Sequence, residues 1–100
     1  MTNERREEER INVSLNVRWA GATGADTSRL SDIGLGGCFI DTLGQVTMGE
    51  LIDLAIQLPD GEWLPLRGEV AFYQPNIGFS VCFTFITEDE QEALERLMNK

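Results

Sequence analysis

A strict alternation of apolar and polar residues runs from Ile11 to Trp19 and constrains the fold more than any other feature of the chain. Every second side chain in this stretch is apolar, which is the pattern of a β-strand with one face buried and the other in water. The same period of two returns in three later segments, residues 51–58, 63–73 and 77–85. The pattern therefore predicts a mainly β fold.

Short runs of glycine, proline and polar residues separate the strand-like segments. The Pro-Asp-Gly run at 59–61 favours a tight reversal, because proline presets φ and glycine accepts a positive φ. Pro65 and Gly68 indicate an edge or bulged strand. The other segments are assigned to a loop at 21–26, a short strand at 27–33, an extended run at 38–40, a connection at 43–50 and a turn at 74–76.

The C-terminal segment is predicted to form one short helix. Thr87 and Glu90 have the spacing of a capping box, in which each side chain bonds a main-chain N–H of the other residue. One apolar face follows, made of Ala93, Leu94, Leu97 and Met98. The combined pattern predicts a mainly all-β fold: a small six-stranded antiparallel β-barrel with a short C-terminal α-helix.

The charge of the chain excludes several classes of partner. Seventeen acidic and 8 basic residues give a formal charge of −9. A protein that binds duplex nucleic acid needs a broad basic face, so neither DNA nor RNA is an expected partner.

No run of about 18 apolar residues is present, so no membrane insertion is expected. Residues 1–10 are polar, without the apolar core of a secretory signal, which predicts a cytoplasmic protein.

The content of cysteine and histidine limits the chemistry. Cys38 and Cys82 both lie in apolar strand-like segments, which favours buried free thiols over a disulfide. Without histidine the chain has no conventional zinc site and no histidine-based catalytic triad. The acids at 88–90 belong to the first turn of a helix, where acids are normal. We therefore expect no metal, no cofactor and no enzymatic activity.

The aromatic residues in the strand patterns have two interpretations. Trp19 lies on the apolar face of the first strand and is expected in the core. Tyr73 lies near the end of a strand, where it either stacks on a ligand or packs in the ordinary way. The pattern alone leaves both uses of Tyr73 open.

Two further features are not required by folding alone. Arg5, Arg6 and Arg10 form an arginine cluster just before the first strand, and Asp-Ile-Gly-Leu-Gly-Gly occupies 32–37. Taken singly, a solvated charged leader and a glycine-rich turn explain them. Their order and spacing on a predicted barrel are more specific than either feature alone.

Together these features resemble the two motifs of the PilZ family, RxxxR and [D/N]xSxxG. Arg6 and Arg10 match the two arginines, and Asp32 and Gly37 match the first and last positions of the second motif. The similarity extends over nearly the whole chain, through the reversal at 59–61 and the last strand to the acidic terminal helix. The resemblance implies a leader at 1–10 that binds ligand and a PilZ-like β-barrel domain at 11–100.

The resemblance also implies a ligand, cyclic di-GMP. Arg6 and Arg10, assisted by Arg5, would pair with the guanine edge, stack on the base or hold a phosphate. Asp32 accepts hydrogen bonds only, which suits the N1–H and N2–H₂ donors of guanine. The turn glycines would let main-chain N–H groups approach the ligand. These glycines are Gly34, Gly36 and Gly37.

Gly34 departs from the motif, because it stands where the family has serine. A hydrogen bond to a charged group is worth about 1.5–3 kcal/mol, so its loss weakens the site. Two functions are therefore predicted from different classes. One is a micromolar cyclic di-GMP receptor whose leader reorders on binding and signals to a protein partner in trans. The other is a PilZ-like interaction adaptor that binds no nucleotide.

Overall fold

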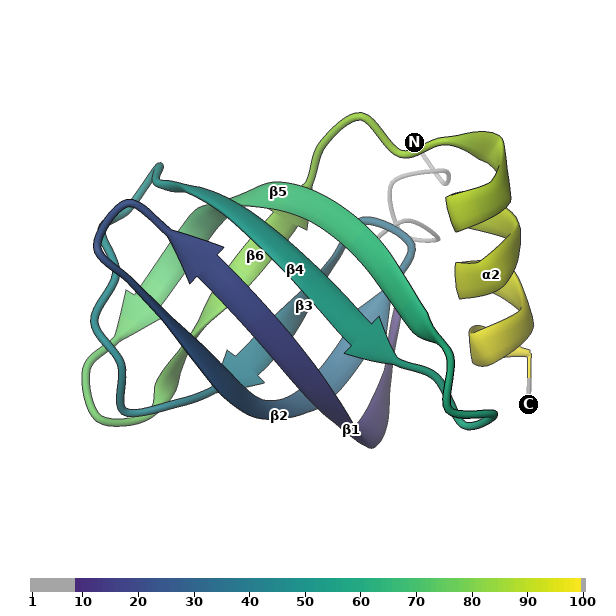
Figure 1. The fold of residues 1–100 in the computed structure, drawn as a ribbon, viewed down its shortest axis with the longest axis horizontal. Coiled ribbons are helices and arrows are strands. Elements are labelled where there is room, and N and C mark those ends of the chain that lie inside the picture. Colours follow the sequence, from purple (N-terminus) through teal and green to yellow (C-terminus); the bar gives the residue numbers. More distant parts are fainter. Residues whose placement is uncertain (1–8, 100) are drawn as a thin grey trace.

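The computed structural model describes residues 9–99, which form a barrel of six strands with one helix at an end of it (Figure 1). The elements are β1 (Arg10–Gly21), β2 (Gly24–Gly34), β3 (Gly37–Asp41), β4 (Leu51–Gln57), β5 (Trp63–Gln74), β6 (Gly78–Phe83) and α2 (Glu88–Met98). The sheet closes in the order β1-β2-β3-β6-β5-β4, and all six strand pairs are antiparallel. The predicted six-stranded antiparallel barrel with a C-terminal helix is confirmed.

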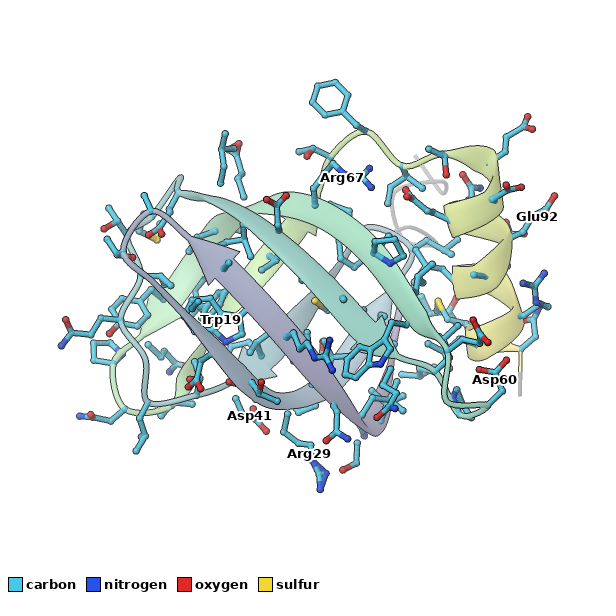
Figure 2. The ribbon with its side chains drawn as sticks, viewed as in Figure 1. Trp19, Arg29, Asp41, Asp60, Arg67 and Glu92 are labelled. Carbon is cyan, nitrogen blue, oxygen red and sulfur yellow. The ribbon has the colours of Figure 1, made fainter. Side chains whose placement is uncertain are left out.

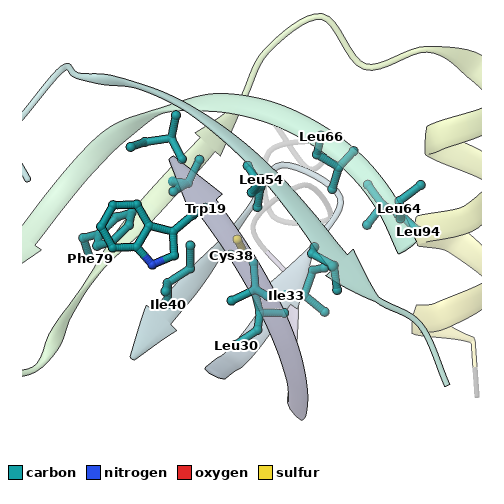
Figure 3. Packing of buried hydrophobic residues seen from close by; sticks show 14 of the residues in the cluster. Trp19, Leu30, Ile33, Cys38, Ile40, Leu54, Leu64, Leu66, Phe79 and Leu94 are labelled. Carbon is teal, nitrogen blue, oxygen red and sulfur yellow. The ribbon is translucent and has the colours of Figure 1, made fainter. Parts of the chain in front are cut away.

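The apolar faces of all six strands meet inside the barrel. Trp19 and Phe79 pack edge to face at one end, with ring centroids 5.0 Å apart, and Cys38 lies further along the core (Figure 3). Leu94 of α2 is fully buried at the other end, so the helix closes the barrel there. The core position predicted for Trp19 is confirmed, since this side chain is 3% exposed.

The helix begins where the sequence predicts. Thr87 accepts a hydrogen bond from the Glu90 N–H, and the Glu90 carboxylate accepts one from the Thr87 N–H, so the capping box is complete. Ala93, Leu94 and Leu97 form the buried face. In the described part of the chain, no helix is both long and apolar enough to cross a membrane.

The loop expected at 21–26 is wrong, because the strands on both sides extend into it. β1 continues to Gly21 and β2 begins at Gly24, so a two-residue turn joins them. The short strand expected at 27–33 is consequently 11 residues long. Pairing with β1 supplies hydrogen bonds to the polar residues 24–26 whatever their local sequence, so the local pattern places the start of β2 too late.

The edge or bulge expected in the 63–73 segment is confirmed, but the alternation expected beyond it is wrong. Pro65 lies where β5 pairs with β4 alone, since pairing with β6 starts at Gly68. A Cβ at Gly68 would collide with a main-chain carbonyl of β6. The pairing of β5 with β6 shifts between Val70 and Phe72, and this irregularity leaves Phe72 51% exposed.

Three other side chains expected inside the barrel lie at its surface. β6 covers only Gly78–Phe83, so Ile77 and Phe85 fall outside the strand and are 54% and 86% exposed. Cys38 and Cys82 are both free thiols, but only Cys38 is buried. Cys82 occupies an outward position of β6, so the expectation of two buried thiols is wrong for this residue.

Candidate functional site

An ion pair between Arg10 and Asp32 marks the start of the barrel. The Arg10 Nη1 donates to the Asp32 Oδ1 at 2.9 Å, although 22 residues separate them in the chain. Antiparallel pairing of β1 with β2 explains the contact, since Arg10 lies opposite Gly34 and Asn12 opposite Asp32. Both side chains remain about one-third exposed, at 36% and 32%, so each remains accessible to a ligand.

Gly37 leaves room for the Arg10 guanidinium beside β3. A Cβ on Gly37 would lie 3.1 Å from the Arg10 Nη2 and would collide with the carbonyl oxygen of Val81. Any larger residue at this position would therefore displace either the guanidinium or β6. The Arg10–Asp32 pair thus lies beside the buried Gly37, where β1, β2 and β3 are neighbours.

Gly34 is buried against the chain that leads into β1. A Cβ at Gly34 would collide with the main-chain carbonyl oxygen of Glu9 and would lie 3.1 Å from the Arg10 Cγ. Sequence reasoning identified only a missing hydroxyl at this position. The structure adds that the chain leading into β1 occupies the space that a serine side chain would need.

The other predicted residues fall beside or beyond this surface. Gly36 lies in the turn between β2 and β3, and its carbonyl oxygen accepts a hydrogen bond from the Phe83 N–H at 2.9 Å. Arg5 and Arg6 lie outside the described residues, as does most of the leader predicted at 1–10. The ligand-binding role of Arg6, the first arginine of the RxxxR motif, therefore stays a prediction.

A hollow of about 260 Å³ lies next to the turn of the motif. Leu35 and Met98 give it apolar walls, while Glu9 and Glu95 bring carboxylates. Sequence reasoning missed this hollow, because its residues come from β2–β3, α2 and the approach to β1, and no local pattern relates them. Asn99 completes the lining, so the hollow is of mixed polarity. Its two carboxylates suit a ring that carries N–H donors, and they disfavour a phosphate.

Beneath this surface lies Cys38, in the barrel interior. Burial raises the pKa of its thiol far above the usual range, and the nearby Arg10 charge lowers that pKa only in part. The Asp32 carboxylate raises it further. Cys38 is therefore a neutral packing residue and not a nucleophile or a metal ligand.

Two further aromatic residues are structural in this conformation. Tyr73 packs against the core as a partly buried residue, as its ordinary-packing interpretation predicts. The Arg18 guanidinium lies 4.1 Å from the centre of the Trp63 ring, in cation–π contact on the outer surface.

Within residues 9–99, no group of three or more histidine, cysteine, aspartate or glutamate side chains is placed to hold a metal.

Comparison with known proteins identifies solved structures with a similar fold. The inhibitor of motility (MotI/DgrA) of Bacillus subtilis has a similar structure, with a TM-score of 0.74 and 22% identity, over 96% of this chain and 52% of that one. The chain thus spans about half the length of that protein. The PilZ domain of CeSA from a cellulose-synthesizing bacterium gives a TM-score of 0.71 and 20% identity, over 92% of this chain and 97% of that domain.

These two similarities, at such identities, establish a shared fold. No curated protein matches the chain. The family model described as "PilZ domain" matches residues 4–100, which include the predicted arginines, the glycine turn, the barrel and the helix. The chain belongs to the PilZ domain family.

Proposed function

We propose that this PilZ domain is a non-enzymatic receptor for cyclic di-GMP. PilZ domains typically bind this dinucleotide and are generally non-catalytic receptor modules. The observation that carries the proposal is the pairing of Arg10 with Asp32 beside Gly37, the three matched motif positions within the described residues. A guanidinium and a carboxylate side by side offer complementary groups to one guanine: donors for its O6/N7 edge and acceptors for its N1–H and N2–H₂.

Ligand binding would exchange one set of hydrogen bonds for another. In the free protein Arg10 and Asp32 satisfy each other, and an exposed pair of this kind contributes only about 0–1 kcal/mol to stability. Separating the pair to hold a ligand therefore costs little. The carboxylates of Glu9 and Glu95 would repel the phosphates of the ligand from the hollow beside Leu35. The phosphates would therefore face the arginines, and a guanine ring would be directed toward the hollow.

The leader at 1–10 would complete the site. Arg5 and Arg6 would add two guanidinium groups to that of Arg10, and pairing them with the ligand would order the leader against the barrel. A partner protein in trans would then read the reordered surface. Gly36 and Gly37 would contribute main-chain N–H groups, and Gly34 would keep the leader close to β2.

Isothermal titration of the full chain with cyclic di-GMP tests this proposal, with GTP and cyclic di-AMP as control ligands. We expect selective binding of about micromolar affinity for the parent chain. Arg10→Ala and Asp32→Asn should each bind at least about tenfold more weakly. Arg29→Ala is the matched control, because Arg29 is an exposed arginine of β2 whose guanidinium bonds Ser14 outside the site. Equal affinities for parent and Arg10→Ala would overturn the assignment of the site.

The proximity of Gly34 to Glu9 supports a second candidate function. Without the motif serine, and with carboxylates at Glu9 and Glu95 beside the turn, the domain would keep the barrel as an interaction adaptor and bind no nucleotide. Thermal unfolding separates the two functions. A true ligand at 100 times its dissociation constant adds about 2.7 kcal/mol to the free energy of unfolding, whereas the adaptor shows no shift.

A further inference from the structure

Phe85 is an exposed phenylalanine with a disfavoured backbone. Its side chain is 86% exposed, more than any other large apolar residue among residues 9–99, and its φ is 51°. A bulky side chain adopts a positive φ only when its surroundings impose it, because this conformation is disfavoured for residues other than glycine and, to a lesser degree, asparagine and aspartate. An exposed aromatic side chain in a strained conformation serves neither the core nor solubility.

The segment around Phe85 is held on both sides. The Thr84 N–H donates to the main-chain oxygen of Arg67 at 2.8 Å, and the Arg67 Nη1 donates to the Phe85 carbonyl oxygen at 2.6 Å. Ile86 packs against the core, and Thr87 caps α2. In Figure 2, Arg67 lies at the foot of this connection between β6 and α2. Phe85 is therefore presented on a fixed support, which reduces the entropy lost when a partner covers it.

The segment that follows Phe85 in the chain is acidic. Glu88, Asp89 and Glu92 are exposed on the first turns of α2, and Glu92 points away from the barrel in Figure 2. Among the described residues, Arg67 donates to the Phe85 carbonyl oxygen and is already paired with Glu90 at 2.8 Å. Residues 84–92 thus carry acidic side chains and no lysine or arginine, in line with the charge of the whole chain.

We propose that Phe85 is the anchor of a docking surface for a protein partner with an apolar pocket rimmed by lysine or arginine. Aromatic side chains that fill a pocket at the centre of an interface carry much of the binding energy, and charged groups around them set specificity and the rate of association. Charge complementarity selects this occupant. A second copy of the chain would bring Glu88, Asp89 and Glu92 against other acidic groups.

The docking surface does not depend on nucleotide binding. It is nonetheless close to the candidate ligand site, because the Phe83 N–H donates to the carbonyl oxygen of Gly36 in the motif turn. A movement of that turn would therefore displace Phe83, which lies two residues before Phe85 in the chain. Measuring the partner's affinity with and without cyclic di-GMP therefore separates the two proposals: docking without nucleotide supports the surface even if the receptor proposal fails.

Site-specific photo-crosslinking tests the surface. The full chain carries p-benzoylphenylalanine at position 85 in its native cells, and the matched control carries it at position 72, another exposed phenylalanine, on β5. We expect an adduct from position 85 and none from position 72. The captured protein is then purified and titrated against the parent chain, Phe85→Asn, Phe72→Ser and the double variant Glu88→Lys, Asp89→Lys.

The proposal predicts a distinct order of affinities. Phe85→Asn should bind at least about tenfold more weakly with an unchanged or higher melting temperature, because asparagine tolerates a positive φ. Phe72→Ser should bind like the parent. The charge-reversed variant should bind more weakly than the parent at low salt, with a smaller difference at about 0.5 M salt. The absence of an adduct at position 85, an adduct between two copies of this chain, or an unchanged affinity of Phe85→Asn would overturn the proposal.

Discussion

Gly34 lies against the main chain of the residue that precedes β1, and this contact changes what a serine would do there. A Cβ would collide with the Glu9 carbonyl oxygen, so Gly34→Ser should force the chain around Glu9 and Arg10 outward. Overpacking of this kind costs about 1–3 kcal/mol. We therefore predict a lower melting temperature and no gain in affinity for cyclic di-GMP, despite the closer match to the family motif.

Gly24→Ser is the matched control for this substitution. Gly24 also belongs to β2, but a Cβ there meets no atom within 4 Å, so its serine variant should unfold like the parent. Thermal unfolding and nucleotide titration of the three proteins decide the question. Tighter binding by Gly34→Ser at an unchanged melting temperature would show that the chain at Glu9 moves aside at little cost.

Glu50 is a second residue whose role comes from contacts far along the chain. Its carboxylate accepts hydrogen bonds from the Thr23 N–H at 2.9 Å and from the Thr47 N–H at 2.8 Å, which ties the β1–β2 turn to the β3–β4 connection. The hydrogen bond from the Thr23 main chain is the largest cause that lowers the pKa of Glu50 below its ordinary value.

The sign of this pKa shift predicts how stability depends on pH. A carboxyl whose pKa is lower in the folded state than in the unfolded state, where it is about 4.3, stabilises the fold above that value. This contribution is lost as the pH falls through the folded-state pKa. Glu50→Gln should therefore melt below the parent at pH 7, and the difference should shrink in acid. Glu69→Gln, at an exposed position of β5, is the control. A difference in melting temperature between Glu50→Gln and the parent that stays constant with pH would contradict the prediction.

At the scale of elements, α2 is attached to the barrel by two different kinds of contact. Leu94 and Leu97 bury its apolar face against the open end of the barrel. Arg67 of β5 donates to both the Glu90 carboxylate and the Phe85 carbonyl oxygen, and so fixes the first turn of the helix. The apolar contact holds the helix on the barrel, whereas the Arg67 contact fastens its first turn to β5.

Arg67→Gln should loosen α2 without unfolding the barrel. We predict several-fold faster amide hydrogen exchange in α2 and unchanged exchange in β1 and β4, because local opening reports the contacts of each element. Arg96→Gln is the control, as an exposed arginine of the same helix. Unchanged exchange in α2 of Arg67→Gln would mean that Leu94 and Leu97 suffice to hold it.

For the molecule as a whole, net charge outweighs paired charge. The chain has a charge of −9, and within residues 9–99 the ion pairs are Arg10–Asp32 and Arg67–Glu90. Salt screens both attraction and repulsion, and repulsion dominates in a small domain of this charge. The melting temperature should therefore rise between about 10 and 300 mM sodium chloride. A lower melting temperature at the higher salt concentration would indicate that the two ion pairs stabilise the fold more than the charge repulsion destabilises it.

Most of the fold could be predicted from local patterns. The alternation from Ile11 to Trp19, the reversal at 59–61 and the capping box at Thr87 each specify an element through interactions between near neighbours in the chain. Phe72 and Phe85 follow the same alternation and yet lie outside the core. Their positions depend on a shift in strand pairing and on the end of β6, which are properties of pairs of strands and have no signal in one strand alone.

The candidate site divides in the same way. The residue types of the site can be recognised in the sequence, since the arginines, Asp32 and the glycine turn are present in the order of the PilZ motifs. Their arrangement depends on the folded chain: Arg10 pairs with Asp32, Gly37 leaves room for the guanidinium, and the chain at Glu9 covers Gly34. The hollow beside Leu35 and the anchoring of Phe85 also required it. Barrel closure brings together segments that are far apart in the chain, and contacts between such segments produce no periodic pattern in the sequence. The geometry of the site follows from that closure.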